Sequence, residues 1–114
     1  MNLGVDIVEI SRIEELITKY GKRFIERVFC NQEIEYANRK PYPAQHFAGF
    51  WSAKEAIIKA LGDKAPTTFK QICISHTADN KPIPIIHQAM NSESEILLSI
   101  SHTDSYAVAV AIVV

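Results

Sequence analysis

The sequence contains little cysteine and no long hydrophobic run. Its 114 residues include two cysteines, Cys30 and Cys73, far apart and without the spacing of a zinc site or a Cys-x-x-Cys motif. We therefore expect free thiols in a cytoplasmic protein. No apolar run reaches the roughly 18 residues of a membrane span, and the N-terminus lacks the basic segment and cleavage site of a secretory signal. These absences predict no membrane partner and no removed leader.

The chain also lacks an excess of charge of either sign. Twelve Lys and Arg against 13 Asp and Glu give a formal net charge of −1, which argues against general nucleic-acid binding. A local basic surface could still recruit an acidic partner. At this length we expect a single domain, residues 1–114, large enough for a core but too short for two domains.

Helical signals fill the first half of the chain after a strand rich in Val and Ile. Ser11 to Glu14 matches a capping box, Asn31 is expected to cap a later helix, and Pro43 suits the first turn of the longest one. Gly21 and Gly62 are C-terminal stop signals. The expected elements are a strand at 2–9 and helices from Arg12 to about 20, near 22–27, near 33–37 and at 43–61.

The second half changes to β-branched residues, with expected strands at about 69–76, 83–88, 95–102 and 105–113. Turn signals join them at 79–82 and 103–105. A strand, then helices, then a meander of strands predicts an α+β domain: an antiparallel sheet packed by helices on one face.

Four polar residues lie where their surroundings are apolar or where they share a helix face. Asp6 interrupts an apolar strand and His102 ends another, while Glu55 and Lys59 lie one turn apart on a stripe with Ser52. A buried carboxylate needs a cation or hydrogen-bond donors. Each residue also has a simpler interpretation: an exposed strand-end Asp, a surface Glu–Lys pair worth about 0.2–0.5 kcal/mol, or a structural histidine.

Three segments together point to a family. Residues 4–10 (GVDIVEI), 51–60 (WSAKEAIIKA) and 99–103 (SISHT) closely resemble the holo-acyl-carrier-protein synthases, the short, single-unit 4′-phosphopantetheinyl transferases. The three segments span nearly the whole chain.

The resemblance implies transfer of 4′-phosphopantetheine from coenzyme A to a serine of apo acyl carrier protein, releasing adenosine 3′,5′-bisphosphate and supporting fatty acid biosynthesis. The family's Mg²⁺ ligands map onto Asp6 and Glu55, hard oxygen donors of the kind that this cation prefers. Lys59 and His102 would face coenzyme A phosphates, with Gly62 nearby. Lys59, Glu55 or a metal-bound water could each act as the base.

The resemblance also implies partners. Arg12 and Arg23 match positions that pair with an acidic carrier protein, and Phe24 would supply an apolar anchor; a solvated helix face is the simpler interpretation. Short members of the family assemble as homotrimers with sites between protomers. The rival readings are a catalytically degenerate module that binds coenzyme A or carrier protein, and a structural domain without a metal.

Two departures from the family pattern concern the nucleotide. Phe50 stands where Arg is usual, which removes a cation that could contact a coenzyme A phosphate. Asp63, Lys64 and Ala65 replace a Gly-Thr-Gly continuation, so the backbone there is less permissive. Lys64 could replace the lost positive charge.

Overall fold

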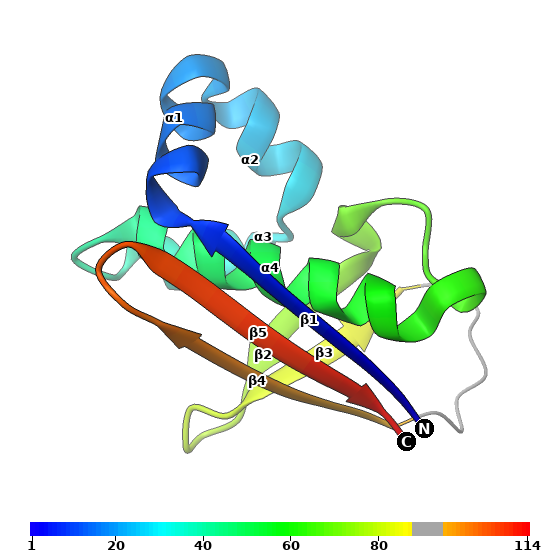
Figure 1. Ribbon diagram of the computed structural model, residues 1–114. Coiled ribbons are helices and arrows are strands. Elements are labelled where there is room, and N and C mark those ends of the chain that lie inside the picture. Colours follow the sequence, from blue (N-terminus) through cyan, green and yellow to red (C-terminus); the bar gives the residue numbers. More distant parts are fainter. Residues whose placement is uncertain (88–94) are drawn as a thin grey trace.

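The computed structural model describes residues 1–87 and 95–114 as a layer of helices on one face of a sheet (Figure 1). The helices are α1 (Ile10–Tyr20), α2 (Lys22–Val28), α3 (Asn31–Asn38) and α4 (Pro43–Leu61), with short 3-10 turns η1 (Gly62–Lys64) and η2 (Phe69–Gln71). The strands are β1 (Asn2–Glu9), β2 (Ile72–His76), β3 (Pro82–Ile86), β4 (Ile96–His102) and β5 (Tyr106–Val113). This arrangement confirms the predicted α+β class.

The strands form two antiparallel sheets rather than one meander. The first and last strands of the chain pair over their full length, so that the order in the larger sheet is β1-β5-β4. The hairpin β2-β3 forms a separate two-stranded sheet. Because β1 joins the C-terminal strand, Asp6 lies opposite Ala109 and two strands away from β4.

Helix α4 packs across the inner face of the larger sheet, where alternate residues are small. Ala107, Ala109 and Ala111 of β5 are fully or almost fully buried. A side chain on Gly4 of β1 would clash with the backbone carbonyl of Ala56. These small residues let the strands approach the helix backbone closely, which fixes Asp6 against α4.

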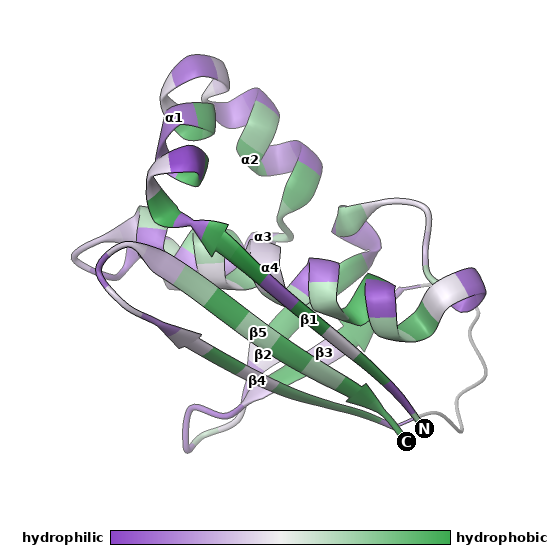
Figure 2. Cartoon of the chain, viewed as in Figure 1, coloured by the Kyte–Doolittle hydropathy of each residue, from purple (hydrophilic) through white to green (hydrophobic). Residues whose placement is uncertain are grey.

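The outer face of the same sheet is apolar as well. Coloured by hydropathy, β1, β5 and β4 are largely hydrophobic along their length (Figure 2). Leu3, Val5 and Ile7 alternate with the inward residues of β1 and are 65%, 52% and 64% exposed. Since alternate residues of a strand point to opposite faces, both faces of β1 are suited to packing. No helix in the described ranges is both long and apolar enough to span a bilayer.

Several predicted boundaries were wrong. Helix α1 begins at Ile10, with Glu9 at the N-cap and no side-chain cap, so the Ser11 capping box is not used. Asn31 is the first residue of α3, and Cys30 is its N-cap: the Cys30 amide donates to Glu33 Oε1 at 3.0 Å. Residues 69–71 form η2 instead of strand, and the predicted strand end at 88 lies outside the described residues.

The prediction of free thiols was also wrong. Cys30 and Cys73 form a disulfide with a Cα–Cα distance of 5.8 Å and a sequence separation of 43 residues. Their spacing in sequence gives no sign of this, because the fold brings the start of α3 against β2.

Candidate functional site

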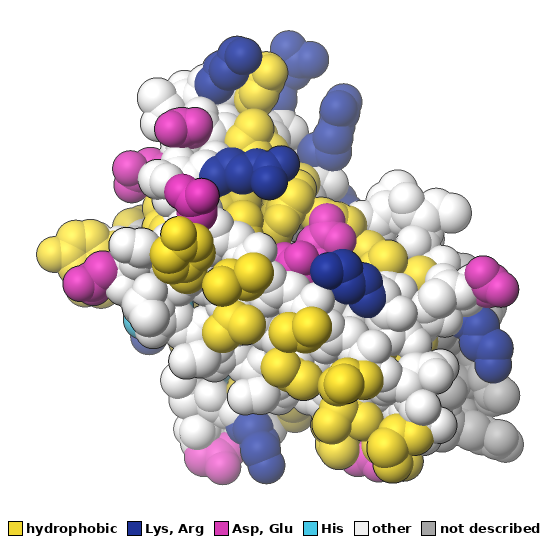
Figure 3. Space-filling model, viewed as in Figure 1, with side chains coloured by type: hydrophobic (Ala, Val, Ile, Leu, Met, Phe, Trp, Pro, Cys, Tyr) yellow, Lys and Arg dark blue, Asp and Glu magenta, His cyan; other side chains and the backbone are white. Residues whose placement is uncertain are grey.

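Asp6, Glu55 and Lys59 form what we call the carboxylate site. Lys59 Nζ lies 3.4 Å from Asp6 Oδ1 and donates to the Val5 carbonyl oxygen at 3.0 Å. Asp6 is on the face of β1 that meets α4, between buried Gly4 and Val8. Glu55 and Lys59 are one turn apart on α4, so the helix presents both toward β1. Acidic and basic side chains lie together at this junction (Figure 3).

The pKa of Glu55 is shifted by burial and by its surroundings, including the Asp6 carboxylate. Burial raises the pKa of Glu55 above its ordinary value, and the Asp6 carboxylate raises it further. Lys59 and Arg12 oppose this shift and lower the pKa. The site therefore holds two acidic groups that repel one another, with two positive side chains nearby.

This donor set suits a hard divalent cation. Two carboxylates from different elements converge, and their mutual repulsion would be relieved by a positive ion between them. Mg²⁺ favours one or two carboxylates together with waters and substrate phosphates. Asp6 and Glu55 are the residues that would hold it.

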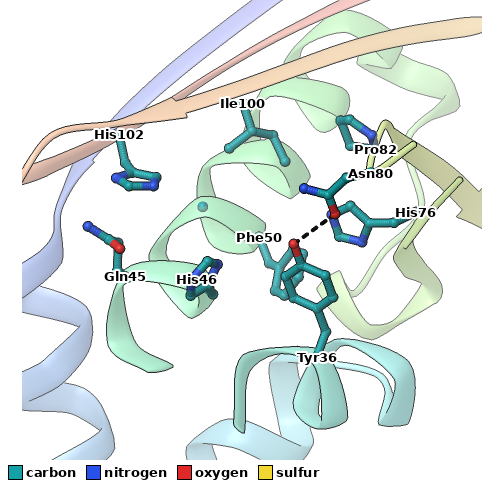
Figure 4. Close-up of a pocket in the computed structure, with 10 residues that line it drawn as sticks. Tyr36, Gln45, His46, Phe50, His76, Asn80, Pro82, Ile100 and His102 are labelled. Carbon is teal, nitrogen blue, oxygen red and sulfur yellow. Dashed lines mark hydrogen bonds between the residues drawn. The ribbon is translucent and has the colours of Figure 1, made fainter. Parts of the chain in front are cut away.

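His102 lies elsewhere, in what we call the histidine pocket. This cavity of about 200 Å³ is lined by residues from α3, α4, β2 and β4, together with Asn80 and Pro82 of the β2-β3 hairpin. In Figure 4, His102 and Gln45 lie at one end, while Tyr36, Phe50 and His76 lie at the other. Tyr36 and His76 stack with ring centroids 4.2 Å apart and planes 6° apart, and the Tyr36 hydroxyl donates to Asn80 Oδ1 at 3.1 Å.

Phe50, at the position where the family resemblance predicted an arginine, is buried in this pocket. Its ring packs edge-on against Tyr36 at 5.7 Å and against His76 at 6.0 Å. Burial lowers the pKa of His46 and of His76, and Lys40 lowers both further. The pocket thus favours neutral imidazoles: His76 stacks on Tyr36, and His46 packs edge-on against Tyr36 and against the exposed His102.

The two sites lie on opposite sides of α4. His46 and Glu55 are nine residues apart, as are Phe50 and Lys59, and nine residues make roughly two and a half helical turns. Strand β5 also separates β1 from β4. The structure therefore brings together Asp6, Glu55 and Lys59, but it does not bring His102 to them within one chain.

The remaining predicted residues are distributed as follows. Arg12 and Arg23 are exposed, and Phe24 is partly buried, with its ring 6.0 Å from both Phe29 and Trp51. Gly62 caps the C-terminus of α4 with φ 58°, the left-handed region that favours glycine. Lys64 follows in the exposed turn η1.

Two interactions behind the site were missed or misread. Ser52, predicted on a polar stripe, is fully buried and donates to the Ala107 carbonyl at 3.2 Å. Lys54 is buried too, with Nζ 2.7 Å from Glu33 Oε1 and three backbone carbonyls as acceptors. The available signal was position, since Lys54 is four residues after Phe50 and three before Ile57 on the apolar side of the helix.

Comparison with known proteins assigns this chain and its fold to a protein family. The family model described as the 4′-phosphopantetheinyl transferase superfamily matches residues 2–111. The chain belongs to this superfamily.

Three similar proteins all belong to one type of enzyme within this superfamily. The holo-[acyl-carrier-protein] synthase of Protochlamydia amoebophila is 41% identical over 122 residues, covering 98% of this chain and 96% of the relative. The structure of the Helicobacter pylori synthase in complex with coenzyme A superposes with a TM-score of 0.84 at 31% identity, covering 98% of this chain and 99% of that one. The Neisseria meningitidis synthase gives a TM-score of 0.88 at 28% identity, with coverages of 99% and 97%. This chain is an enzyme of the holo-[acyl-carrier-protein] synthase type.

Proposed function

We propose that the protein transfers 4′-phosphopantetheine from coenzyme A to a serine of apo acyl carrier protein in a Mg²⁺-dependent reaction that supports fatty acid biosynthesis. The observation that carries the proposal is the convergence of Asp6, Glu55 and Lys59 where β1 crosses α4. The coenzyme A complex of the Helicobacter pylori relative supports the same substrate. The products are holo acyl carrier protein and adenosine 3′,5′-bisphosphate.

Each residue of the carboxylate site has a role in this reaction. Asp6 and Glu55 would hold Mg²⁺, which supplies charge neutralisation for the pyrophosphate as the serine oxygen attacks. Lys59 is 55% exposed, so its ammonium group can reach a phosphate in solvent while still paired with Asp6. Lys59 thereby orients the leaving nucleotide and stabilises its developing charge.

We infer that the complete site is shared between protomers of a homotrimer. His102 and the histidine pocket lie on the opposite side of α4 from Asp6, so a neighbouring copy would have to supply them. The apolar outer face of the larger sheet supports association, since Leu3, Val5, Ile7, Leu97 and Val110 are between 36% and 65% exposed. Figure 3 shows hydrophobic side chains gathered over this face. Such a patch on a folded domain marks an interaction surface.

The acidic carrier protein would dock beside the site, on α1 and α2. Arg12 and Arg23 are exposed there, and Arg12 is close enough to Glu55 to lower its pKa. The acceptor serine can therefore reach the carboxylate site while neighbouring acidic residues pair with these guanidinium groups. Phe24 directly follows Arg23 on α2, and its partly buried ring offers less area than an exposed anchor.

The test is the intact mass of a purified apo acyl carrier protein after incubation with enzyme, coenzyme A and Mg²⁺, with and without chelator. We expect a gain of one phosphopantetheine that is abolished by chelator, by Asp6→Asn and by Glu55→Gln. Glu95→Gln removes one exposed carboxylate far from the site in sequence and should transfer normally. Binding of coenzyme A without any mass gain would instead support the degenerate binding module.

A further inference from the structure

The disulfide between Cys30 and Cys73 joins the two elements that form one wall of the histidine pocket. Cys30 is the N-cap of α3 and Cys73 lies within β2. The same two elements supply Tyr36 and His76, whose rings stack at 4.2 Å in the pocket wall. The covalent link and the stacked pair are thus two connections across a single α3–β2 contact.

A third connection lies beside the disulfide. Glu33 Oε1 accepts from the Cys30 amide at 3.0 Å, and Glu33 Oε2 accepts from the Ile74 amide at 2.7 Å. The buried Glu33 carboxylate therefore accepts from the amide of Cys30 and from the amide of Ile74, the residue after Cys73. Because these hydrogen bonds do not depend on the disulfide, they would keep α3 near β2 after reduction.

The surroundings of Cys30, Cys73 and Glu33 favour thiol–disulfide chemistry over metal binding. The Cys30 and Cys73 sulfurs and a Glu33 oxygen all lie within 4.8 Å of one another. However, the Lys54 ammonium is already 2.7 Å from Glu33. A second cation beside it would meet a positive charge in a buried environment, where such repulsion is strongest.

We propose that Cys30 and Cys73 form a reversible thiol–disulfide site, and that the disulfide form organises the α3–β2 wall of the histidine pocket for nucleotide binding. The second part rests on the proposed function, since it takes the nucleotide to be coenzyme A or its product. The molecule that reacts with the Cys30–Cys73 disulfide is a thiol reductant, either a small thiol or a protein dithiol.

Reduction of the disulfide consumes two thiol groups of the reductant. Cys73 is 4% exposed while Cys30 is partly exposed, so a reductant thiolate attacks the Cys30 sulfur. This attack forms a mixed disulfide at Cys30 and releases the Cys73 thiolate, which takes a proton from water. A second thiol then breaks the mixed disulfide, leaving two protein thiols and one oxidised reductant disulfide.

Reduction loosens the wall without unfolding the chain. Two sulfurs that are no longer bonded must move apart to van der Waals separation, so α3 gains freedom relative to β2. The Tyr36–His76 stack is then held only by its own contacts and by Glu33. A ligand that needs the ordered wall must pay for ordering it.

The experiment compares oxidised and phosphine-reduced wild-type protein, because a phosphine avoids exchange with the coenzyme A thiol. Hydrogen exchange should quicken in residues 31–38 and 72–76 on reduction, with 10–20 unchanged. The Kd for adenosine 3′,5′-bisphosphate, which has no thiol, should rise about fivefold, or about 1 kcal/mol. The double variant Cys30→Ser/Cys73→Ser should have the exchange rates and the nucleotide Kd of the reduced protein, and the phosphine should change neither.

Two results would overturn the proposal: equal exchange rates in 31–38 and 72–76 for both forms, or free thiols that persist in glutathione disulfide. Equal nucleotide affinity of the two forms would overturn the link to the pocket. The proposed function fails separately, if carrier protein stays unmodified in both redox states. The exchange rates need no nucleotide, so they still decide the redox site in that case.

Discussion

Lys54 and Glu33 form an ion pair at 2.7 Å in which both side chains are completely buried. Burial lowers the pKa of Lys54 and raises the pKa of Glu33, and each partner opposes the shift of the other. Lys54 also donates to the carbonyls of Val28, Phe69 and Ile72. The residue next to Glu55 therefore ties α4 to the end of α2, to η2 and to β2.

Breaking this pair should destabilise the protein strongly. Lys54→Met leaves the buried Glu33 carboxylate without its positive partner and three carbonyls without the Lys54 donor, which should cost about 3–5 kcal/mol. The free energy of unfolding in urea measures this cost. Glu35→Ala is the control, because the Glu35–Arg39 pair is exposed at 3.7 Å and should contribute about 0–1 kcal/mol. Similar losses in the two variants would mean that the buried pair does not hold α4 in place.

Stabilisation by Mg²⁺ should increase with pH through the range above 4.5. The pKa of Glu55 is raised in the folded protein, so the folded state binds more protons there than the unfolded state, and its stability falls as pH rises. A bound cation favours the ionised carboxylate and offsets that loss. Melting temperatures with and without Mg²⁺ at pH 5 and pH 7.5 measure the effect.

Glu55→Gln should abolish this pH-dependent Mg²⁺ shift, and Glu95→Gln should keep it. An equal Mg²⁺ shift in wild type and Glu55→Gln would exclude Glu55 as a ligand.

Gly4→Ala should separate β1 from α4. The added methyl group meets the Ala56 carbonyl, and overpacking of this kind costs about 1–3 kcal/mol. Because Asp6 follows two residues later on the same face, activity should fall as well. Gly49→Ala is the control for stability, since its methyl group would lie 3.2 Å from a single methyl carbon of the Ile100 side chain and would meet no backbone atom. Equal stability of the two variants would contradict the close approach of strand and helix.

Ile7→Lys should yield folded monomers. Ile7 is 64% exposed on the outer face of β1, so a lysine is tolerated in the isolated chain but would be desolvated in a trimer interface. Light scattering after gel filtration measures the mass, and circular dichroism measures the fold. Asn38→Lys adds the same charge on α3, away from this face, and should stay trimeric. A trimeric Ile7→Lys variant would place the interface elsewhere.

The sequence predicted the helix boundaries that depend on local signals. It did not predict features that depend on contacts between residues far apart in the chain. Pro43 and Gly62 bound α4 as expected. Helix α1 starts before its capping box because the Ile10 amide bonds to the Ser105 carbonyl at 2.9 Å. The disulfide and the Lys54–Glu33 pair each join residues that only the tertiary fold brings together.

For the site, the sequence indicated that Asp6, Glu55 and Lys59 come together between β1 and α4, as they do in the fold, but it did not indicate that His102 lies apart from them. The family resemblance implied that His102 belongs to the same active site as Asp6 and Glu55. The pairing of β1 with β5, which no local pattern indicates, puts a strand between them. The proposal that a second protomer supplies His102 rests on this topology.

A mixture of two inactive variants tests the shared site most directly. Asp6→Asn removes a carboxylate from one side of α4, and His102→Ala alters the pocket on the other side, so trimers of either variant alone should transfer little phosphopantetheine. Co-refolding them in equal amounts should restore about a quarter of the wild-type sites, because random assembly then pairs one intact carboxylate site with a neighbour's intact pocket. Activity of the mixture no higher than the average of the two variants would contradict sites shared between protomers.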